Sequence, residues 1–408
     1  MKKNQFLGLA FLALGSCMFV SCMDDKYDLD NLDMTIGSKV DLWLPQSSTA
    51  PVQLASFMDL DEQDFVDTVF NQDVEDTIFY AKTSGFFELT MNQIKDGEVV
   101  YSEYAPPIHV ADVPEILEEE DVRLDLDNPV ILANITSGAP SGGKLEADFE
   151  IRSYKNDNDE PNAVCEVQGL KVENPKSCSY VARKEEFIPS KLLDPQFGEP
   201  AFLELAPGQN FSDLILNVPD RLNTYARKLV ASGFGKPVLT PTVVRVDLQI
   251  YAPLCIGPRF KIQYKSTEDG WAEDYGEDIE KAVADNLASI TVEAKIDNDA
   301  PLDAEIEVVP IDVNGRDITD LPKLTTTVSA KSKDNPFQYT LKTREGSGRN
   351  LLDFISGKNN TPVIDGIRIV CTLKANQNYV GEYLRTRTSV RMKDVRLGIK
   401  GDISYDAN

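Results

Sequence analysis

The segment Val-Val-Arg-Val-Asp-Leu-Gln-Ile at residues 243–250 alternates apolar and polar side chains and decides the expected fold class. Successive side chains of a β-strand point to opposite faces, so a period of two predicts a strand with one buried face. The same alternation recurs at residues 290–296, 304–308 and 367–373. The 23 prolines and 24 glycines mark frequent turns between such segments. We therefore expect an all-β chain of tandem β-sandwich modules with a few short helices.

Two segments carry helical signals. Residues 221–232 follow Pro219-Asp220 and stop before Gly233, which are the residue types expected at the start and the end of a helix. Residues 279–287 are a weaker candidate. The sequence thus predicts one helix at 221–232 and helical turns elsewhere.

Two alignments of the chain with itself predict an internal repeat. In the first alignment, 131–145 matches 292–306, and both copies consist of a strand, a polar turn with Ala-Pro, and a second strand. In the second alignment, 245–252 matches 368–375. The two alignments have different offsets, so together they predict related modules with an insertion in the first. The alternative is chance similarity, because any two amphipathic strands match in part.

The expected organisation follows from these patterns. The predicted parts are a signal peptide (1–21), an acidic tether (22–37), an N-terminal β region that stands alone or completes the first sandwich (38–121), β-sandwich module 1 (122–265), a linker (266–284) and β-sandwich module 2 (285–408).

The N-terminus has the pattern of a secretory signal peptide, with Met1-Lys2-Lys3 followed by an apolar stretch at 6–20. The segment ending in Ser21-Cys22 resembles a bacterial lipobox, in which the cysteine becomes acylated after cleavage. Leu14-Gly15-Ser16-Cys17 fits the same pattern. We favour Cys22, with Cys17 as the alternative, because polar sequence begins directly after Cys22. A plain secreted protein is the other possibility.

An acidic segment, Asp24 to Asp33, follows the cysteine and contains Tyr-Asp-Leu-Asp-Asn-Leu-Asp. This arrangement resembles the start of uncharacterised surface lipoproteins of Bacteroidota, in which acidic residues after the cysteine direct export to the outer face of the outer membrane. The resemblance is confined to the N-terminal segment that ends near Asp33. It implies a location at the cell surface and no particular activity. If the segment is only a solvated tether, the protein faces the periplasm instead.

Four further cysteines lie beyond the signal peptide and the anchor. Disulfides are permitted in an oxidising compartment, and Cys165 and Cys178 lie close together in the sequence, around turn signals. We predict a disulfide between these two, with free thiols as the alternative. Cys255 and Cys371 lie in or beside apolar segments and are expected to be small buried side chains.

Composition excludes several functions. The 67 acidic and 41 basic residues of the 408-residue chain produce a net charge of −26, which repels nucleic acids. The chain has a single histidine, His109, which we expect to be a loop or packing residue. Motifs of serine hydrolases, zinc proteases and nucleotide-binding loops are absent from the sequence. We therefore expect neither a catalytic site nor a bound cofactor.

Two weaker patterns concern ligands. The acidic segments 156–160 and 297–299 contain oxygen ligands that suit calcium, but turns rich in Asx residues explain them equally well. Trp271 and Tyr275 lie one helical turn apart in numbering, in a polar segment bounded by glycines. They form a candidate ligand platform, on which aromatic rings would stack against sugar rings. Packing of these rings against the adjacent module is the alternative.

The leading hypothesis is a lipid-anchored outer-membrane protein, exposed at the cell surface, that acts as a non-catalytic binding or structural and adhesion module. Its partners would be the membrane, through the N-terminal lipid, and a glycan or protein ligand outside the cell. One alternative is an extracellular carbohydrate-active hydrolase that uses an Asp/Glu pair. Another is a fimbrial-type assembly subunit.

Overall fold

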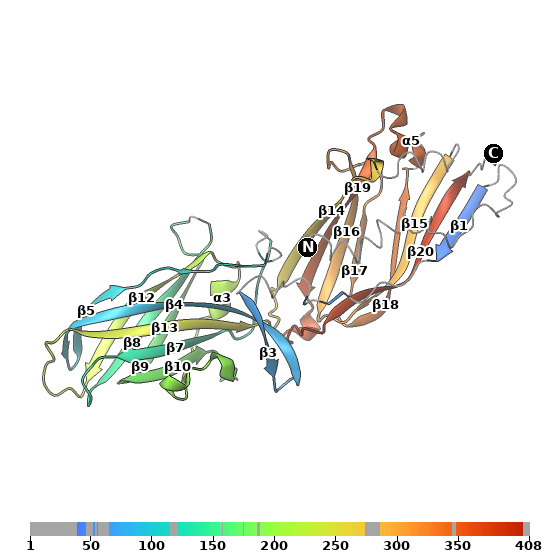
Figure 1. Ribbon diagram of the computed structural model, residues 1–408. Helices are drawn as coiled ribbons and strands as arrows, with labels where there is room; N and C mark the ends of the chain where they lie inside the picture. Colours follow the sequence, from blue (N-terminus) through green and yellow to red (C-terminus); the bar gives the residue numbers. More distant parts are fainter. Residues whose placement is uncertain are drawn as a thin grey trace. The chain divides into compact units, whose positions relative to one another are not determined.

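The computed structural model describes residues 39–45, 52–53, 55, 65–114, 117, 121–156, 158–173, 175–185, 188–273, 286–344 and 348–402. The chain divides into two compact units (Figure 1). We call residues 58–262 and 375–387 the central unit. Residues 1–57, 263–374 and 388–408 form the terminal unit. Strands dominate both units, which confirms the predicted all-β class of sandwich modules.

The central unit is a sandwich of two sheets. Its large sheet has the order β11-β10-β7-β13-β4-β3, and β5 pairs with β4. Its small sheet has the order β6-β12-β8-β9. The strands of the large sheet are β3 (Val66–Asn71), β4 (Asp76–Lys95), β5 (Glu98–Tyr104), β7 (Val130–Ser137), β10 (Lys176–Ala182), β11 (Ala201–Glu204) and β13 (Thr242–Pro253). Those of the small sheet are β6 (Ile108–His109), β8 (Lys144–Tyr154), β9 (Ala163–Val172) and β12 (Arg221–Ser232).

The core of the central unit lies between these two sheets. Alternate residues of β4 and β13, among them Phe87, Leu89 and Val246, meet alternate residues of β8, such as Phe149. The rings of Phe87 and Phe149 lie 5.6 Å apart. The period of two found in the sequence therefore places one face of each strand in the core and leaves the other face outside.

The terminal unit is a second sandwich. One sheet has the order β1-β20-β15-β18, with β2 also paired to β20, and the other has the order β14-β19-β16-β17. The strands of the first sheet are β1 (Lys39–Pro45), β2 (Val52–Gln53), β15 (Asn286–Asn298), β18 (Ser332–Lys342) and β20 (Ser389–Asp402). Those of the second sheet are β14 (Lys261–Glu268), β16 (Leu302–Asp312), β17 (Leu324–Val328) and β19 (Ile364–Ala375).

The two units have matching strand orders. The path β10-β7-β13-β4 of the central unit corresponds to β18-β15-β20-β1, and β6-β12-β8-β9 corresponds to β14-β19-β16-β17. The alignment of 131–145 with 292–306 therefore joins equivalent pairs, since β7 and β8 correspond to β15 and β16. The alignment of 245–252 with 368–375 is wrong, because it matched β13 with β19. By sheet position, the counterpart of β13 is β20 and that of β19 is β12.

The helix predicted at 221–232 is also wrong, since these residues form strand β12. The register with β8 shifts between Ala226 and Lys228, which marks a β-bulge. Buried Leu222 and Leu229 therefore lie on the same face although an odd number of positions separates them. The seven-residue spacing of these leucines is typical of a helix. The bulge thus removes the simple alternation that would have indicated a strand, and the flanking Pro219-Asp220 and Gly233 then favoured a helix.

Each unit is built from segments that are not contiguous in the sequence, and the predicted domain boundaries differ from these segments. Of the region expected at 38–121, β1 and β2 pair with β20 in the terminal unit, and β3 to β6 belong to the central unit. The start of the expected linker, 266–268, lies within β14. Residues 375–387, expected in module 2, belong to the central unit. There Leu384 donates its N–H to Leu254 O (2.8 Å), and Arg387 pairs with Asp76 (2.7 Å).

The helices of the described residues are short, and side chains cap most of them. They are α3 (Phe211–Ile215), α5 (Leu351–Ser356) and the 3-10 turns η3 (Ser190–Leu192), η4 (Pro195–Phe197), η5 (Lys358–Asn360) and η6 (Gln377–Tyr379). Asn350 accepts the N–H of Asp353 (3.0 Å), whose carboxylate accepts the N–H of Asn350 (2.8 Å), so α5 begins with a capping box. Within the described residues, helices with the length and apolar character needed to cross a membrane were not found. The candidate at 279–287 lies mostly outside the described residues.

Candidate ligand-binding face

The outer surface of the large sheet in the central unit carries a group of aromatic and charged side chains that are partly or largely exposed. Because side chains alternate along a strand, the residues between the buried positions of β4 and β13 point outward. We use the name open face for five of these outward residues on β4, β5 and β13: Phe86, Glu88, Tyr104, Arg245 and Asp247.

Strand register brings these five residues together. Arg245 lies opposite Glu88, and Glu88 lies opposite Tyr104, so three neighbouring strands contribute one row. Asp247 lies opposite Phe86 in the next outward-facing row. Residues directly opposite each other in antiparallel strands have Cβ atoms about 5 Å apart. The five side chains therefore form one continuous patch.

Arg245 lies at the centre of the patch. Its guanidinium donates to Glu88 Oε1 (3.1 Å) and to Asp247 Oδ1 (3.0 Å). Its Cζ atom lies 3.9 Å from the centroid of the Phe86 ring, which is the geometry of a cation–π contact. Hydrogen bonds, first to Asp247 and then to Glu88, raise the pKa of Arg245 above its ordinary value. The guanidinium is thus held in one place by two carboxylates and a ring.

Tyr104 extends the aromatic surface toward solvent. Its ring centroid lies 6.2 Å from that of Phe86, at an interplanar angle of 50°. Tyr104 is 61% exposed, which is high for an aromatic residue at the end of a strand. Exposed Val243 lies on the neighbouring row of β13, and exposed Val100 lies farther along β5. Contiguous apolar residues exposed on one surface can mark a binding site.

Another part of the outer surface of the large sheet is covered. Tyr80, Leu132, Tyr180 and Tyr251 pack under a segment that contains η3 and η4, and Leu192, Leu193, Phe197 and Phe202 cover them. Lys191 of that segment lies 4.7 Å above the Tyr80 ring. The chain therefore buries part of this surface with its own residues and leaves the open face accessible.

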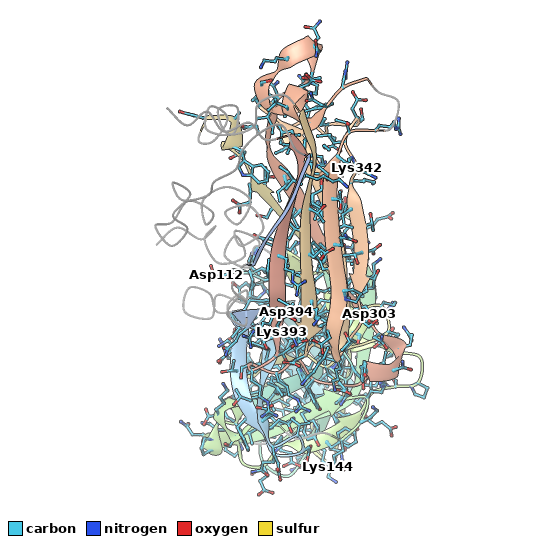
Figure 2. All side chains as sticks on the ribbon, turned by 90° about the vertical axis from the view of Figure 1, so that its right-hand side faces the viewer. Asp112, Lys144, Asp303, Lys342, Lys393 and Asp394 are labelled. Carbon is cyan, nitrogen blue, oxygen red and sulfur yellow. The ribbon has the colours of Figure 1, made fainter. Side chains whose placement is uncertain are left out.

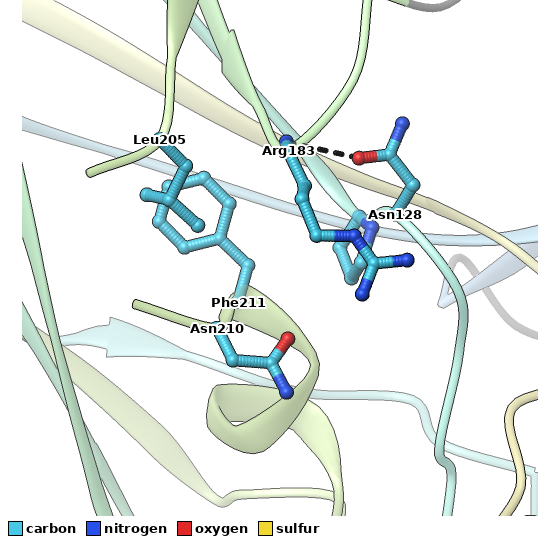
Figure 3. A pocket seen from close by; sticks show the side chains of 6 residues that line it. Asn128, Arg183, Leu205, Asn210 and Phe211 are labelled. Atoms are coloured by element: carbon cyan, nitrogen blue, oxygen red, sulfur yellow. Dashed lines mark hydrogen bonds between the residues drawn. The ribbon is translucent and has the colours of Figure 1, made fainter. Parts of the chain in front are cut away.

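The cavity drawn in Figure 3 is too small for a ligand. It is lined by Asn128, Pro129, Arg183, Leu205, Asn210 and Phe211, and its volume of about 10 Å³ holds about one water molecule. Asn128 accepts the N–H of Arg183 (3.0 Å) and the N–H of Lys184 (3.2 Å), which ties the end of β10 to the start of β7. These contacts have a structural role.

The structure corrects the predicted ligand platform. Trp271 is 9% exposed and belongs to the core of the terminal unit, in a cluster with Leu351, Phe354 and Ile367. Its ring is not available for stacking on a ligand. The position of Tyr275 lies outside the described residues. The short polar segment suggested a surface loop, but residues 271–273 form a helical turn that places Trp271 in the core.

The predicted disulfide is also corrected. Cys165 and Cys178 are free and buried. Cys165 lies on β9 in the core between the sheets, whereas Cys178 lies on β10 in the cluster on the outer surface of the large sheet. The two thiols lie in different clusters on opposite sides of the large sheet and form no disulfide in this structure. Burial raises the pKa of Cys165 to about 12 and the pKa of Cys178 to about 11, so both thiols are poorly reactive.

The other cysteines have separate positions. Cys255 is buried, and Cys371 is partly buried in β19. Cys22 and Cys17 lie outside the described residues, so the prediction of lipid attachment stays a prediction.

Of the two acidic segments considered for calcium, 297–299 has protein partners. Asp297 pairs with Lys393 (2.8 Å), which is labelled in Figure 2, and accepts the N–H of Asp334 (2.9 Å). Asn298 is buried; its side-chain oxygen accepts the N–H of Ala300, and its amide nitrogen donates to Leu302 O and Ser329 O. Asp157 lies outside the described residues. Within the described ranges, groups of three or more metal-binding side chains were not found.

His109 is exposed and lies on β6, opposite Arg221 of β12. Near this pair, the small sheet carries an ion cluster around Glu150, whose side chain is 3% exposed. The Glu150 carboxylate pairs with Arg152 and accepts the Nε–H of Arg227 (2.7 Å). This cluster ties β8 to β12, and we interpret it as a stabilising feature of the sheet.

Sequence reasoning missed the open face. The residues of Phe86–Glu88, Tyr104 and Arg245–Asp247 come from three strands, and nothing in their spacing along the chain marks them as neighbours. A partial signal was present, because Arg245 and Asp247 are the polar positions of the alternating segment 243–250. Pairing of β4 with β13 would have been needed to place Phe86 and Glu88 beside them.

Comparisons with known proteins support the fold. The "putative secreted protein" of Parabacteroides distasonis ATCC 8503 is similar in structure, with a TM-score of 0.53 and 14% identity over 88% of this chain and 99% of that one. At this identity the similarity shows a shared fold alone. A Desmodium yellow mottle tymovirus chain (TM-score 0.18, 11% identity, 38% of this chain and 85% of that one) carries no argument. The same holds for the CBM22 tandem domain of Paenibacillus barcinonensis Xyn10C (TM-score 0.16, 8% identity, 90% of this chain and 99% of that one). No protein-family model and no curated protein matches the chain.

Proposed function

We propose that the chain is a lipid-anchored, non-catalytic binding protein of the cell envelope, and that its ligand docks on the open face. The observation that carries the binding role is the arrangement around Arg245, which is held at a fixed position beside two rings and two carboxylates. A rigid group of aromatic and charged side chains on strands loses little conformational entropy on binding.

The N-terminal sequence supports the anchor. The lipobox-like segment ending at Cys22 is followed by acidic sequence, as in the surface lipoproteins that it resembles. The first strand, β1, begins at Lys39 and pairs along its length with the last strand, β20. The segment between Cys22 and Lys39 can span at most about 60 Å when fully extended. The segment after Cys22 would therefore connect the lipid anchor to the terminal unit, at the edge strand β1 of its sheet.

Acyl labelling tests the anchor. Cells that express the full chain, Cys22→Ala or Cys17→Ala are grown with an alkyne-tagged fatty acid. Label on the wild type and on Cys17→Ala, but not on Cys22→Ala, is the expected result. Label that persists on Cys22→Ala and disappears from Cys17→Ala would move the anchor to Cys17. An unlabelled wild-type chain would overturn the lipid anchor.

A polysaccharide hydrolysis assay tests whether the protein is non-catalytic. The purified mature protein is incubated with polysaccharides, and reducing ends are measured over time. Binding without release of reducing ends is the expected result. Release that depends on carboxylate residues would favour the alternative of an extracellular hydrolase and would overturn the proposed function.

A further inference from the structure

We infer that the ligand of the open face is a neutral, hydroxyl-rich polysaccharide chain; this inference rests on the proposed function and names its ligand. The face lies on the outer surface of three neighbouring strands, and its residues are Phe86, Glu88, Tyr104, Arg245 and Asp247. Three properties of these residues support a neutral sugar ligand, namely their charge balance, their free acceptors and their exposed ring.

The charge balance does not suit an anionic ligand. The guanidinium of Arg245 is shared between Glu88 and Asp247, at 3.1 and 3.0 Å. Two carboxylates therefore surround one cation, and the face has a small negative charge within a chain whose net charge is −26. A polymer that carries carboxylates or sulfates would be repelled by this arrangement.

The carboxylates suit hydroxyl groups. Each ionised carboxylate has about four lone-pair sites, and Arg245 occupies only part of them. Between a third and a half of each of the side chains of Glu88 and Asp247 is exposed. An apolar protein surface placed here would remove water from these oxygens without replacing its hydrogen bonds, which is costly. Sugar hydroxyls would donate to the same oxygens.

The rings suit the apolar side of a sugar. A pyranose carries C–H groups on its ring faces, and these pack well on exposed aromatic rings. Tyr104 is 61% exposed and lies beside Phe86, whose ring is in turn held by Arg245. Because the five residues lie on one sheet surface, they form a platform that an extended chain can cross without entering a cleft.

Affinity electrophoresis tests the inference. The mature acylated protein, in nonionic detergent, is run in native gels that contain amylopectin, laminarin, galactomannan or xylan, with polygalacturonate and dextran sulfate as anionic probes. Slower migration in at least one neutral gel is the expected result. Slower migration only in the anionic gels would overturn the inference, and so would unchanged migration in all of them.

Substitutions test whether the polysaccharide binds on the open face. Tyr104→Ala removes the exposed ring and is expected to weaken binding about fivefold to tenfold, whereas Tyr104→Phe keeps it near the wild-type value. Phe70→Ala is the matched control, because Phe70 is 57% exposed on β3 of the same sheet. Its neighbours Asp67 and Val69 contact the residues of the outer surface, so Phe70 points to the opposite side.

Glu88→Gln and Asp247→Asn distinguish the two ligand chemistries. Loss of a carboxylate acceptor is expected to weaken binding to a neutral chain about threefold to tenfold. Unchanged or stronger binding of both variants to the neutral chain would overturn the inference. If the wild type binds and Tyr104→Ala binds equally well, the open face is not the binding site, and of the proposed function only the non-catalytic binding role stands. If the wild type releases reducing ends, the proposed function itself fails.

Discussion

Ser137 and Asn298, which occupy matching positions of the sequence repeat, have the same role in two different units. The hydroxyl of Ser137 accepts the N–H of Ala139 (3.2 Å), and the side-chain oxygen of Asn298 accepts the N–H of Ala300 (2.9 Å). Each bond closes the turn between the equivalent strand pairs β7–β8 and β15–β16. Both residues are buried, and both turns continue into Ala-Pro. The repeat thus preserves the chemistry of a turn as well as the order of the strands.

Asn298→Ala is expected to destabilise the terminal unit by about 3 kcal/mol, whereas Ser137→Ala should cost the central unit about 1 kcal/mol. The difference arises because the Asn298 amide also donates to Leu302 O (2.9 Å) and Ser329 O (3.1 Å). Urea denaturation followed by tryptophan fluorescence measures the first effect.

The fluorescence signal separates the two units. The two tryptophans of the chain, Trp43 and Trp271, belong to the terminal unit. Ser137→Ala should therefore leave the fluorescence transition unchanged and shift only a transition measured by circular dichroism. Equal shifts of the fluorescence midpoint by both variants would contradict the assignment of these turns to separate units.

Glu150→Gln is expected to destabilise the central unit by about 2 kcal/mol at neutral pH, because Arg152 and Arg227 lose their shared carboxylate. Burial raises the pKa of Glu150, but hydrogen bonds from Arg152 and Arg227 outweigh burial and lower it overall. A lowered pKa stabilises the fold above the ordinary glutamate pKa of about 4.3, and that stabilisation is lost as the pH falls through the folded value.

The difference in stability between wild type and Glu150→Gln should therefore be full at neutral pH and shrink below about pH 4. Circular dichroism during urea denaturation at a series of pH values measures it. Glu166→Gln is the control, since Glu166 lies opposite Glu150 on β9 and is exposed. A difference that grows as the pH falls would mean that the ion cluster does not stabilise the fold.

Trp271→Ala is expected to cost the terminal unit about 3 to 5 kcal/mol, since it removes a large buried side chain from the core. Trp271→Phe keeps most of the volume and should cost less. Denaturation followed by circular dichroism measures both variants. Neither substitution should weaken polysaccharide binding by the folded protein. If a variant keeps wild-type stability but loses binding, Trp271 would have to be part of the ligand-binding surface.

The buried thiols are expected to resist modification. Cys165 and Cys178 should react with Ellman's reagent only after the protein is unfolded, because burial raises the pKa of both thiols. Alkylation in denaturant without a reductant should modify all four cysteines beyond the anchor, as read by mass spectrometry. Alkylation of Cys165 and Cys178 that requires a reductant would show that a disulfide joins them after all.

The sequence by itself determined the features that depend on neighbours along the chain. Alternation within 243–250 and 290–296 depends on the pleat of a single strand, so the all-β class could be predicted. The repeat that matches 131–145 with 292–306 could be recognised because a strand, a turn and a strand are contiguous. The signal peptide and the Cys22 segment are likewise local patterns, and their role in anchoring stays a prediction.

Tertiary structure alone decided everything that depends on pairing between distant segments. Strand β12 was predicted to be a helix because one bulge interrupts the alternation of its apolar and polar residues. Only the pairing with β8 makes this bulge visible. Trp271 is buried because the sheets of the terminal unit enclose it. The open face exists because β13 pairs with β4, which places Arg245 against Phe86 although the two lie far apart in the sequence. Register is a property of the assembled sheet, and no single strand contains it.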